Sequence, residues 1–388
     1  MNMHRQRKRG FALPAAVGGL VIIGVLVTAG FYMSRQELRI GVASQFGPMA
    51  VNLAQSGTNQ VIITQSSQLS GMSIWDTTTF NGTMDEGTWS VAVTKLSTRL
   101  FYMDATATVT EGGAMWGGAT RRLGLVTRLT SANIDPPAAL TTQGSLRVGG
   151  SSQIEGHDDI PSGWSGVCDA AALGDMPGIL IDDVTNISTS GTRYTVDGDP
   201  AISQDTTITV DELLSFGDMT WADLVALADI RIPPGASITQ VAPDSTLVGG
   251  SYICNTARDD NWGDPLNAGS ACWSHFPILY ATGDVGIQSN ASGQGIMLVE
   301  GDLKLQGGFT FYGPVIVKGE LSTAGTGGHF NGGVIAANVN LGSSTVLGNA
   351  VVNYSSCAVE RAILNNSALT QVRPLAMRSW VDLTNVVN

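Results

Sequence analysis

An uncharged apolar segment near the N-terminus constrains this chain more than any other feature. No charged side chain occurs between Phe11 and Met33. At about 1.5 Å of rise per residue, a helix of this length covers roughly 34 Å, which exceeds a hydrocarbon core of about 30 Å. The sequence therefore predicts a single membrane-spanning helix, in which Phe11, Leu20, Val27 and Met33 face lipid.

The charges on either side of this segment predict its orientation. Basic residues precede it, whereas Arg35 and Arg39 after it are offset by Glu37. Under the positive-inside rule the N-terminus lies in the cytoplasm and the remaining chain lies outside. A cleaved secretory signal is the alternative, because Val27-Thr28-Ala29 offers small residues at a cleavage position. The preceding basic residues are Arg5, Arg7, Lys8 and Arg9.

Composition predicts what kind of body follows the helix. The chain has 388 residues, enough for two or three domains. Charged residues make up only 13% and glycine accounts for 48 residues, which favours short strands joined by tight turns over a helical bundle. Without the four basic residues of the first ten, 16 basic residues stand against 32 acidic ones, a net charge of −16. Such a body repels nucleic acid and anionic lipid surfaces.

The junction before the apolar segment resembles a known processing signal. A basic leader ends in Gly10 and is followed at once by Phe11, in the arrangement RGFALP. This resembles the type IV prepilin signal, and more closely the start of PilX-type pilus assembly proteins. The resemblance implies that prepilin peptidase cleaves between Gly10 and Phe11, that Phe11 is then methylated, and that the helix serves first as anchor and then as filament core.

Two residues after the junction qualify this resemblance. Ala15 occupies the fifth mature position, where major pilins have a glutamate that pairs with a neighbouring subunit's N-terminal amine. Some minor pilins and pseudopilins also lack that glutamate, so the chain resembles a minor pilin more than a shaft subunit. Pro14 fits a first helical turn, where backbone N–H groups have no partner within the helix.

The pattern after the apolar segment predicts a long helix and then a β meander. An intermittent apolar stripe reaches Leu53-Ala54, and we expect Gly57 to end the helix. From residue 58 to about 135 apolar and polar residues alternate with a period of two, which is typical of β-strands, in VIITQ, TWSVAVTKL, LFYMDATATV and GLVTRL. PilX-like proteins have a small β domain in this position, so the resemblance implies the same at fold level.

The C-terminal third contains an internal repeat. Met297, Val315, Val334 and Val351 begin similar apolar triplets at spacings of 18, 19 and 17 residues. Such repeats predict a parallel β-helix, right-handed by the usual preference for crossovers, in which each coil covers the edge of the previous one. The expected fold is therefore mainly β. Its parts are a basic leader (1–10), a transmembrane pilin-like helix (11–57), a β meander (58–135), a β-helix (136–365) and a tail (366–388).

Within the β-helix region, residues 157–270 read as a decorated insertion, and 138–156 as a further coil. The insertion has one clear helix pattern, from Trp221 to Asp229, preceded by Thr220 in a Thr-x-x-Asp cap. Its apolar face indicates a packing element rather than a binding site.

Four cysteines lie beyond the membrane segment, where thiols oxidise. Three pairings are possible. We favour Cys254 with Cys272, which closes a short loop, and Cys168 with Cys357. A metal site is the alternative, but the sequence has no Cys-x-x-Cys and no paired histidine spacing.

Motifs for catalysis are weak. The sequence has no HExxH, P-loop, GxSxG or dinucleotide fingerprint, and its histidines are scattered. The repeat places Asp302 and Glu320 on successive coils. In β-helix polysaccharide lyases and hydrolases, carboxylates in such positions hold calcium or act as acid and base. The simpler interpretation is a column of solvent-exposed turns. The acidic loop from Asp259 to Asp264 faintly resembles a cation loop and lacks the glutamate of an EF-hand, which favours a plain turn.

These observations predict a non-enzymatic, single-pass inner-membrane protein without metal or cofactor. The resemblance implies a role in type IV pilus or pseudopilus assembly. Its partners would be the inner membrane, prepilin peptidase, other pilin or pseudopilin subunits and an assembly platform, with no nucleic acid. A surface adhesin is one alternative, because stacked strands present long flat faces. An envelope-tethered, polysaccharide-active β-helix enzyme is the other.

Overall fold

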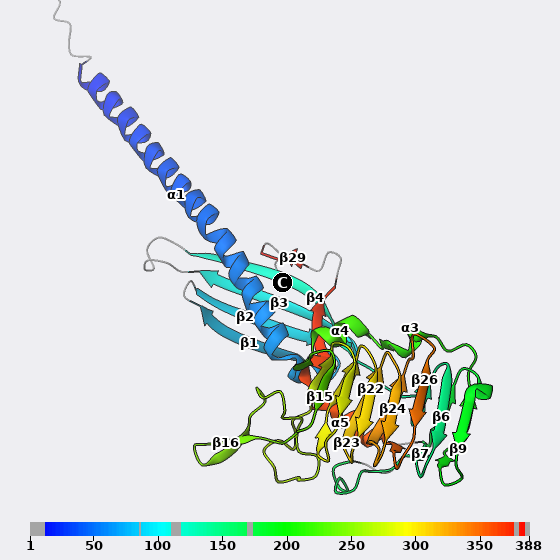
Figure 1. The fold of residues 1–388 in the computed structure, drawn as a ribbon. Helices are drawn as coiled ribbons and strands as arrows, with labels where there is room; N and C mark the ends of the chain where they lie inside the picture. Colours follow the sequence, from blue (N-terminus) through cyan, green and yellow to red (C-terminus); the bar gives the residue numbers. More distant parts are fainter. Residues whose placement is uncertain (1–11, 85–86, 110–117, 169–173, 376–379, 385–388) are drawn as a thin grey trace, which may run out of the picture. The chain divides into compact units, whose positions relative to one another are not determined.

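The computed structural model describes residues 12–84, 87–109, 118–168, 174–375 and 380–384. The chain divides into two compact units, which we call the N-terminal unit (Met1–Leu129 with Val372–Asn388) and the β-helix unit (Thr130–Gln371). Most of the elements in both units are strands (Figure 1). The mainly β fold with a long N-terminal helix, an antiparallel sheet and long parallel sheets is therefore confirmed.

One helix, α1 (Ala12–Thr64), runs through the start of the N-terminal unit and is followed by α2 (Ser66–Ser70). The expected end at Gly57 is wrong, and the VIITQ segment is helical up to Thr64 rather than a strand. Gly57 lies inside the helix, and the ring of Trp89 packs against it. A Cβ added there would meet Trp89 Cδ2 at 2.6 Å. Glycine at this position permits a close contact and does not terminate the helix.

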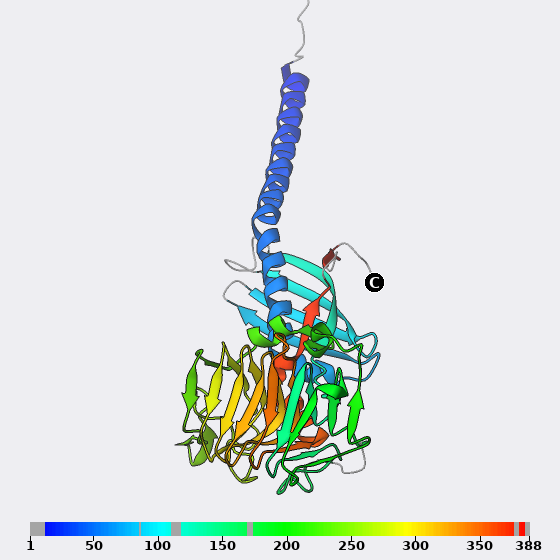
Figure 2. The ribbon, with the colours of Figure 1, turned by 45° about the vertical axis from the view of Figure 1, so that its right-hand side comes forward.

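An antiparallel sheet packs on the second half of α1. Its first four strands are β1 (Thr77–Met84), β2 (Gly87–Lys95), β3 (Leu100–Val109) and β4 (Ala119–Ser131). Burial alternates along β2 and β3, as the period of two predicted. The buried face joins Val91, Phe101 and Met103 to Phe46 and Leu53 of α1 in one core. Figures 1 and 2 show the end of α1 lying along this sheet.

The C-terminal segment adds strands to this same sheet. β28 (Thr370–Pro374) lies next to β4, and β29 (Trp380–Asp382) pairs antiparallel with β4, with Trp380 opposite Leu125. Residues 366–388, expected to be a tail, therefore include two strands. Short strands that pair with a partner far away in the sequence have no repeat or turn signal beside them, which explains why the sequence pattern missed them.

The β-helix unit is built from two long parallel sheets. Along the axis, the first sheet places β10, β7, β27, β25, β23, β21, β18 and β14 side by side, and the second places β15, β19, β22, β24, β26, β6 and β9. A typical coil takes β21 (Ile296–Val299), β22 (Leu303–Gln306) and the first part of β23 (Thr310–Val317). The bounds of the other strands of the first sheet are β10 Thr195–Asp197, β7 Gln153–Glu155, β27 Val351–Tyr354, β25 His329–Ala336, β18 Ile278–Ala281, β14 Ile230–Ile232, β5 Leu140–Thr142, β8 Ile179–Ile181, β11 Ile202–Gln204 and β20 Ser292–Gln294.

In the second sheet the remaining bounds are β15 Ala236–Ile238, β19 Val285–Ile287, β24 Leu321–Ala324, β26 Ser343–Val346, β6 Ser145–Gly149 and β9 Ile187–Ser190. The register follows the repeat, since Met297 lies beside Val315 and Val315 beside Val334. Inward side chains such as Met297 and Leu303 form the central core. The handedness of the coils stays a prediction.

The order of the coils along the axis differs from their order in the sequence. The last repeat coil does not end the stack, because β26 pairs with β6, with Thr345 beside Arg147. Figure 1 shows this as a jump in colour from orange to green between neighbouring strands. The buried Asn338 spans the junction, where its Nδ2 atom donates to the carbonyl oxygen of Gln143 at 2.8 Å. Residues 138–156 thus supply a further coil, as expected.

Much of the region 157–270 is part of the β-helix, so its reading as a decorated insertion is wrong in part. β8, β9 and β10 stack on the coil formed by β5, β6 and β7, while β14 and β15 form the opposite end of the stack. These strands are only three or four residues long, which leaves too little alternation for a pattern to detect. The remaining elements of the region are η1 Val184–Asn186, α3 Val210–Leu213, the β12 Ser215–Phe216 and β13 Met219–Thr220 pair, α4 Trp221–Ala226, and the hairpin β16 Ser245–Val248 with β17 Ser251–Cys254.

Short helices cover the outer face of the first sheet. The Thr220–Asp223 capping box starts α4 as expected, but the helix ends at Ala226. The sequence did not predict α5 (Ser356–Leu364), which precedes η2 (Ser367–Leu369). Leu224 of α4 and Ala358 of α5 share one core with the outward residues Ile296 and Leu298. Both faces of β21 are therefore buried.

Two disulfides tie the unit together. Cys254 and Cys272 form one, with Cα atoms 4.9 Å apart, and Cys168 and Cys357 form the other, with Cα atoms 5.8 Å apart. These are the two pairs that the spacing favoured. The second disulfide joins α5 to a segment far away in the sequence.

Candidate functional site

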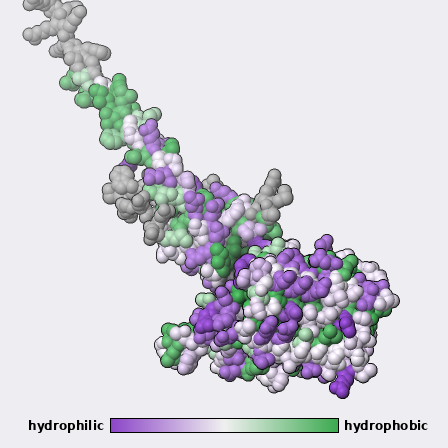
Figure 3. All heavy atoms as spheres, viewed as in Figure 1, coloured by the Kyte–Doolittle hydropathy of each residue, from purple (hydrophilic) through white to green (hydrophobic). Residues whose placement is uncertain are grey.

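The first part of α1 has the properties of a membrane-spanning segment. The stretch Ala16–Leu38 has a mean hydropathy of 2.1 and is not buried by the rest of the described chain. The predicted lipid-facing residues Leu20, Val27 and Met33 are 70%, 52% and 67% exposed. Figure 3 shows apolar surface along this part of the helix. Length and composition allow this segment to cross a bilayer, and a signal sequence passes the same test.

Thr28, a polar residue within this segment, finds its hydrogen-bond partner in the same helix. The hydroxyl group of Thr28 donates to the carbonyl oxygen of Gly24 at 2.7 Å, within the same helix. In hydrocarbon an unpaired hydroxyl would cost several kcal/mol.

The predicted processing residues Gly10 and Phe11 lie outside the described residues. Pro14 lies in the first turn of α1, where its missing N–H group costs no hydrogen bond.

Asp302 and Glu320 occupy the same corner of successive coils. The Oδ1 atom of Asp302 accepts a hydrogen bond from the backbone N–H of Glu320 at 2.8 Å. Asp284, one coil earlier, accepts one from the N–H of Asp302 at 2.9 Å. A glycine at position 319 leaves room for this contact, because a Cβ there would collide with the carboxylate of Asp302. The carboxylates of Asp284 and Asp302 therefore each cap the turn of the next coil.

Beside this column, Glu300 is the centre of a polar network. Its carboxylate accepts hydrogen bonds from Lys318 Nζ at 2.7 Å, Trp221 Nε1 at 2.9 Å and the Tyr280 hydroxyl at 3.2 Å. Burial alone would raise the pKa of Glu300, but these donors outweigh it and hold the pKa below its ordinary value. The ion pair with Lys318 joins two successive coils, and the hydrogen bond from Trp221 attaches α4 to the sheet.

Residues of the acidic loop from Asp259 to Asp264 form hydrogen bonds and an ion pair with residues close by in the sequence. The carboxylate of Asp260 pairs with Arg258, whose Nε lies 2.8 Å from Oδ1. Asn261 is fully buried, and its amide donates to the carbonyl oxygen of Asn255 at 2.9 Å. Asp260 and Asn261 thus already have partners close to the loop.

Arg361 of α5 is a buried cation that the sequence did not single out. Its guanidinium carbon lies 4.1 Å from the ring centre of Trp164, 4.3 Å from Trp273 and 4.9 Å from Phe276. Burial lowers the pKa of Arg361. The aromatic faces supply the stabilisation that a carboxylate would otherwise give, through cation–π attraction. This arrangement anchors α5.

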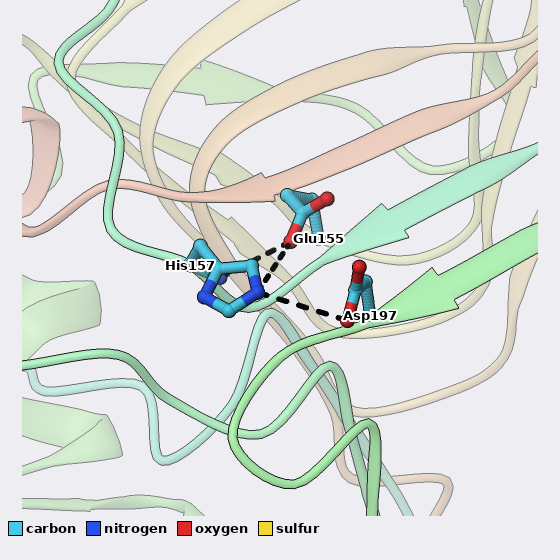
Figure 4. Close-up of side chains that lie close together, drawn as sticks. All are labelled: Glu155, His157 and Asp197. Atoms are coloured by element: carbon cyan, nitrogen blue, oxygen red, sulfur yellow. Dashed lines mark hydrogen bonds and ion pairs between the residues drawn. The ribbon is translucent and has the colours of Figure 1, made fainter.

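A cluster around His157 combines a nitrogen donor with carboxylates. Glu155 ends β7, Asp197 ends β10, and His157 follows two residues after Glu155 (Figure 4). The Nε2 atom of His157 lies 3.8 Å from Glu155 Oε1 and 3.7 Å from Asp197 Oδ1. Its Nδ1 atom lies 2.9 Å from Asp175 Oδ2. The sequence reading placed this histidine among scattered ones.

The charges around His157 affect both partners of its hydrogen bond. The bond to Asp175 raises the pKa of His157, with smaller contributions from the charges of Asp175, Glu155 and Asp197. The same bond lowers the pKa of Asp175. The signal in the sequence was Glu-x-His at the end of a strand, which places both side chains on one face. Asp197 belongs to the next coil, so that half of the cluster was invisible without the fold.

Comparison with known proteins places few constraints on this chain. No family model matches it, and no curated protein matches it. Among solved structures, the competence-associated pilin ComZ from Thermus thermophilus aligns over 87% of this chain and 98% of its own, at 13% identity and a TM-score of 0.23. A TM-score this low does not establish a common fold.

Proposed function

We propose that this chain is a pilin-like envelope protein that acts as a minor subunit in the assembly of a type IV pilus or pseudopilus and catalyses no reaction. One observation carries the proposal. The prepilin-type junction at Gly10 and Phe11 directly precedes α1, an unbroken helix whose first part exposes apolar side chains over a membrane-spanning length. The second part of α1 packs on an antiparallel sheet.

In this role the first part of α1 acts as a membrane anchor before assembly and as part of a helix bundle afterwards. Ala16–Leu38 partitions into the inner membrane, with the basic leader in the cytoplasm and the body outside. After cleavage by prepilin peptidase, an inner-membrane platform extracts the helix into a bundle of subunit helices. Ala15 leaves the bundle without the carboxylate that major subunits use, which favours a single place, such as a filament tip, over repeated stacking. The two disulfides fit an oxidising compartment.

The β-helix unit contributes surface rather than chemistry. The carboxylates of Asp284 and Asp302 cap backbone turns, and Glu300 is held by three donors. These contacts disfavour the polysaccharide-active enzyme, which needs carboxylates that are free to exchange a proton or hold a metal.

The N-terminal residue of the mature protein tests the proposal. The full chain is produced in cells with and without prepilin peptidase, and its N-terminus is determined by mass spectrometry of the membrane fraction. We expect N-methylated Phe11 only when the peptidase is present. Gly10→Val should block cleavage, whereas Gly18→Val, at an open position further along the same helix, should not. A start at Met1 or Gly30 in both strains would overturn the proposal, and Gly30 would favour a secretory signal.

A further inference from the structure

The cluster of Glu155, His157 and Asp197 is the strongest group of metal-ligating side chains among the described residues outside the N-terminal helix. One ligand atom from each of the three lies within 4.8 Å of the others. We propose that these three residues bind a divalent zinc-type cation at a corner of the β-helix, with Asp175 orienting the histidine. This site is independent of the proposed role in filament assembly.

The spacing of the ligand atoms fits a small cation better than a direct ion pair. Nε2 of His157 lies 3.8 Å from Glu155 Oε1 and 3.7 Å from Asp197 Oδ1 (Figure 4). A charged N–H···O hydrogen bond would be about 2.7–2.9 Å. In tetrahedral zinc sites the ligand atoms lie about 2.0–2.2 Å from the metal and hence roughly 3.4 Å from one another. Small side-chain rotations close the remaining difference.

The imidazole is held in the orientation that metal binding needs. Nδ1 of His157 lies 2.9 Å from Asp175 Oδ2, so the hydrogen of a neutral ring is held on Nδ1. The lone pair of Nε2 then faces the two carboxylates. A carboxylate that accepts the second ring N–H is the usual outer partner of a metal-binding histidine.

The backbone places the carboxylates together in a way that calls for a cation. Glu155 and Asp197 are register partners on the parallel strands β7 and β10. Like charges directly beside each other in a sheet are destabilising. A backbone hydrogen bond joins the two strand ends, because the N–H of Gly156 donates to the carbonyl oxygen of Asp197 at 2.9 Å. The two strand ends therefore cannot easily move apart to relieve the repulsion.

The donor set selects the kind of metal. Two carboxylates and a neutral imidazole balance a divalent cation. Calcium prefers six to eight oxygen ligands, whereas zinc is usually four-coordinate and accepts a mixture of nitrogen and oxygen donors. The side chain of His157 is 45% exposed, which leaves an entry path and room for water as a fourth ligand. Bound zinc would join the coil that ends at Glu155 to the next coil outward.

Calorimetric titration of the full chain in detergent micelles with zinc tests the site. We expect one equivalent to bind, and calcium at the same concentration not to compete. His157→Gln and Asp197→Asn should weaken zinc binding by at least about tenfold, and Asp175→Asn by about 10–100-fold through the lost outer contact. His329→Gln and Asp259→Asn, which alter a histidine and an exposed aspartate outside the cluster, should bind zinc like the parent chain.

Two outcomes overturn the proposal. One is the absence of saturable zinc binding to the parent chain, which would leave a protonated histidine as the only cation of the cluster. The other is equal zinc affinity in the parent, His157→Gln and Asp197→Asn. Circular dichroism of each variant without zinc shows whether it is folded, so a misfolded variant is replaced by Glu155→Gln. Zinc binding does not depend on cleavage at Gly10, so each proposal can fail alone.

Discussion

The carboxylate of Asp302 accepts a hydrogen bond from the backbone N–H of Glu320, 18 residues later, at 2.8 Å. Asp284 makes the same contact to the N–H of Asp302. The repeat of a glycine and an acidic residue at each corner is therefore a capping device. The side chain of one coil occupies the space that glycine leaves open in the next, so each coil positions its successor.

Removing this cap should lower stability modestly. We predict that Asp302→Ala reduces the free energy of unfolding by about 0.5–1.5 kcal/mol, the range for one hydrogen bond. Asp302→Asn keeps an acceptor oxygen and should lose less. Urea unfolding followed by circular dichroism measures both. Equal losses for the two variants would show that charge, and not the hydrogen bond to Glu320, is what matters at this corner.

The contact between Gly57 and Trp89 predicts a cost for added volume inside α1. A Cβ at Gly57 would lie 2.6 Å from the Trp89 ring, so Gly57→Ala should destabilise the N-terminal unit by about 1–3 kcal/mol. Gly41→Ala is the matched control. Among the described residues nothing lies within 4 Å of its added Cβ, and alanine there should gain up to about 1 kcal/mol. Thermal unfolding compares the two, and a loss at Gly41 as large as at Gly57 would refute the packing argument.

The two disulfides should differ in how much they stabilise the fold. In the chain-entropy model, closing a separation of 18 residues contributes about 3 kcal/mol and closing 189 residues contributes about 5 kcal/mol. We therefore predict a larger loss for Cys168→Ala with Cys357→Ala than for Cys254→Ala with Cys272→Ala. Denaturant unfolding of the two double variants provides the comparison. The reverse order would mean that local packing around Cys254 outweighs loop length.

The network around Glu300 predicts a stability that depends on pH. Because the folded-state pKa is held below the ordinary value of 4.5, the carboxylate stabilises the fold fully above about pH 4.5. This contribution is lost as the pH falls through the depressed pKa. Glu300→Gln should therefore be less stable than the parent at pH 7, by less than about 1 kcal/mol because the pair is partly exposed.

At pH 3 the difference between the parent and Glu300→Gln should shrink. Urea unfolding at both pH values measures it, with the exposed Glu360→Gln as the control for a general charge effect. A gap that stays constant between pH 7 and pH 3 would contradict the assignment of the pH dependence to Glu300.

Local and periodic signals predicted a large part of this protein. The uncharged run that ends at Met33 is long and apolar enough for a helix that crosses a bilayer. The alternation along β2 and β3 and the spacing from Met297 to Val334 repeat at the periods of a strand and of a coil. The cysteine pairs followed from the short loop between Cys254 and Cys272, which left Cys168 with Cys357.

Contacts between distant segments decided the rest. The coil order, in which Arg147 lies beside Thr345, follows from strand pairing across a long stretch of sequence. The pairing of Trp380 with Leu125 and the meeting of His157 with Asp197 arise in the same way. A period in the sequence shows which positions are equivalent from one coil to the next. The register and the order of the coils depend instead on which strand edges pair with each other. The apolar helix, the alternation along β2 and β3 and the repeat were therefore determined by the sequence alone, and the cluster around His157 only by the tertiary structure.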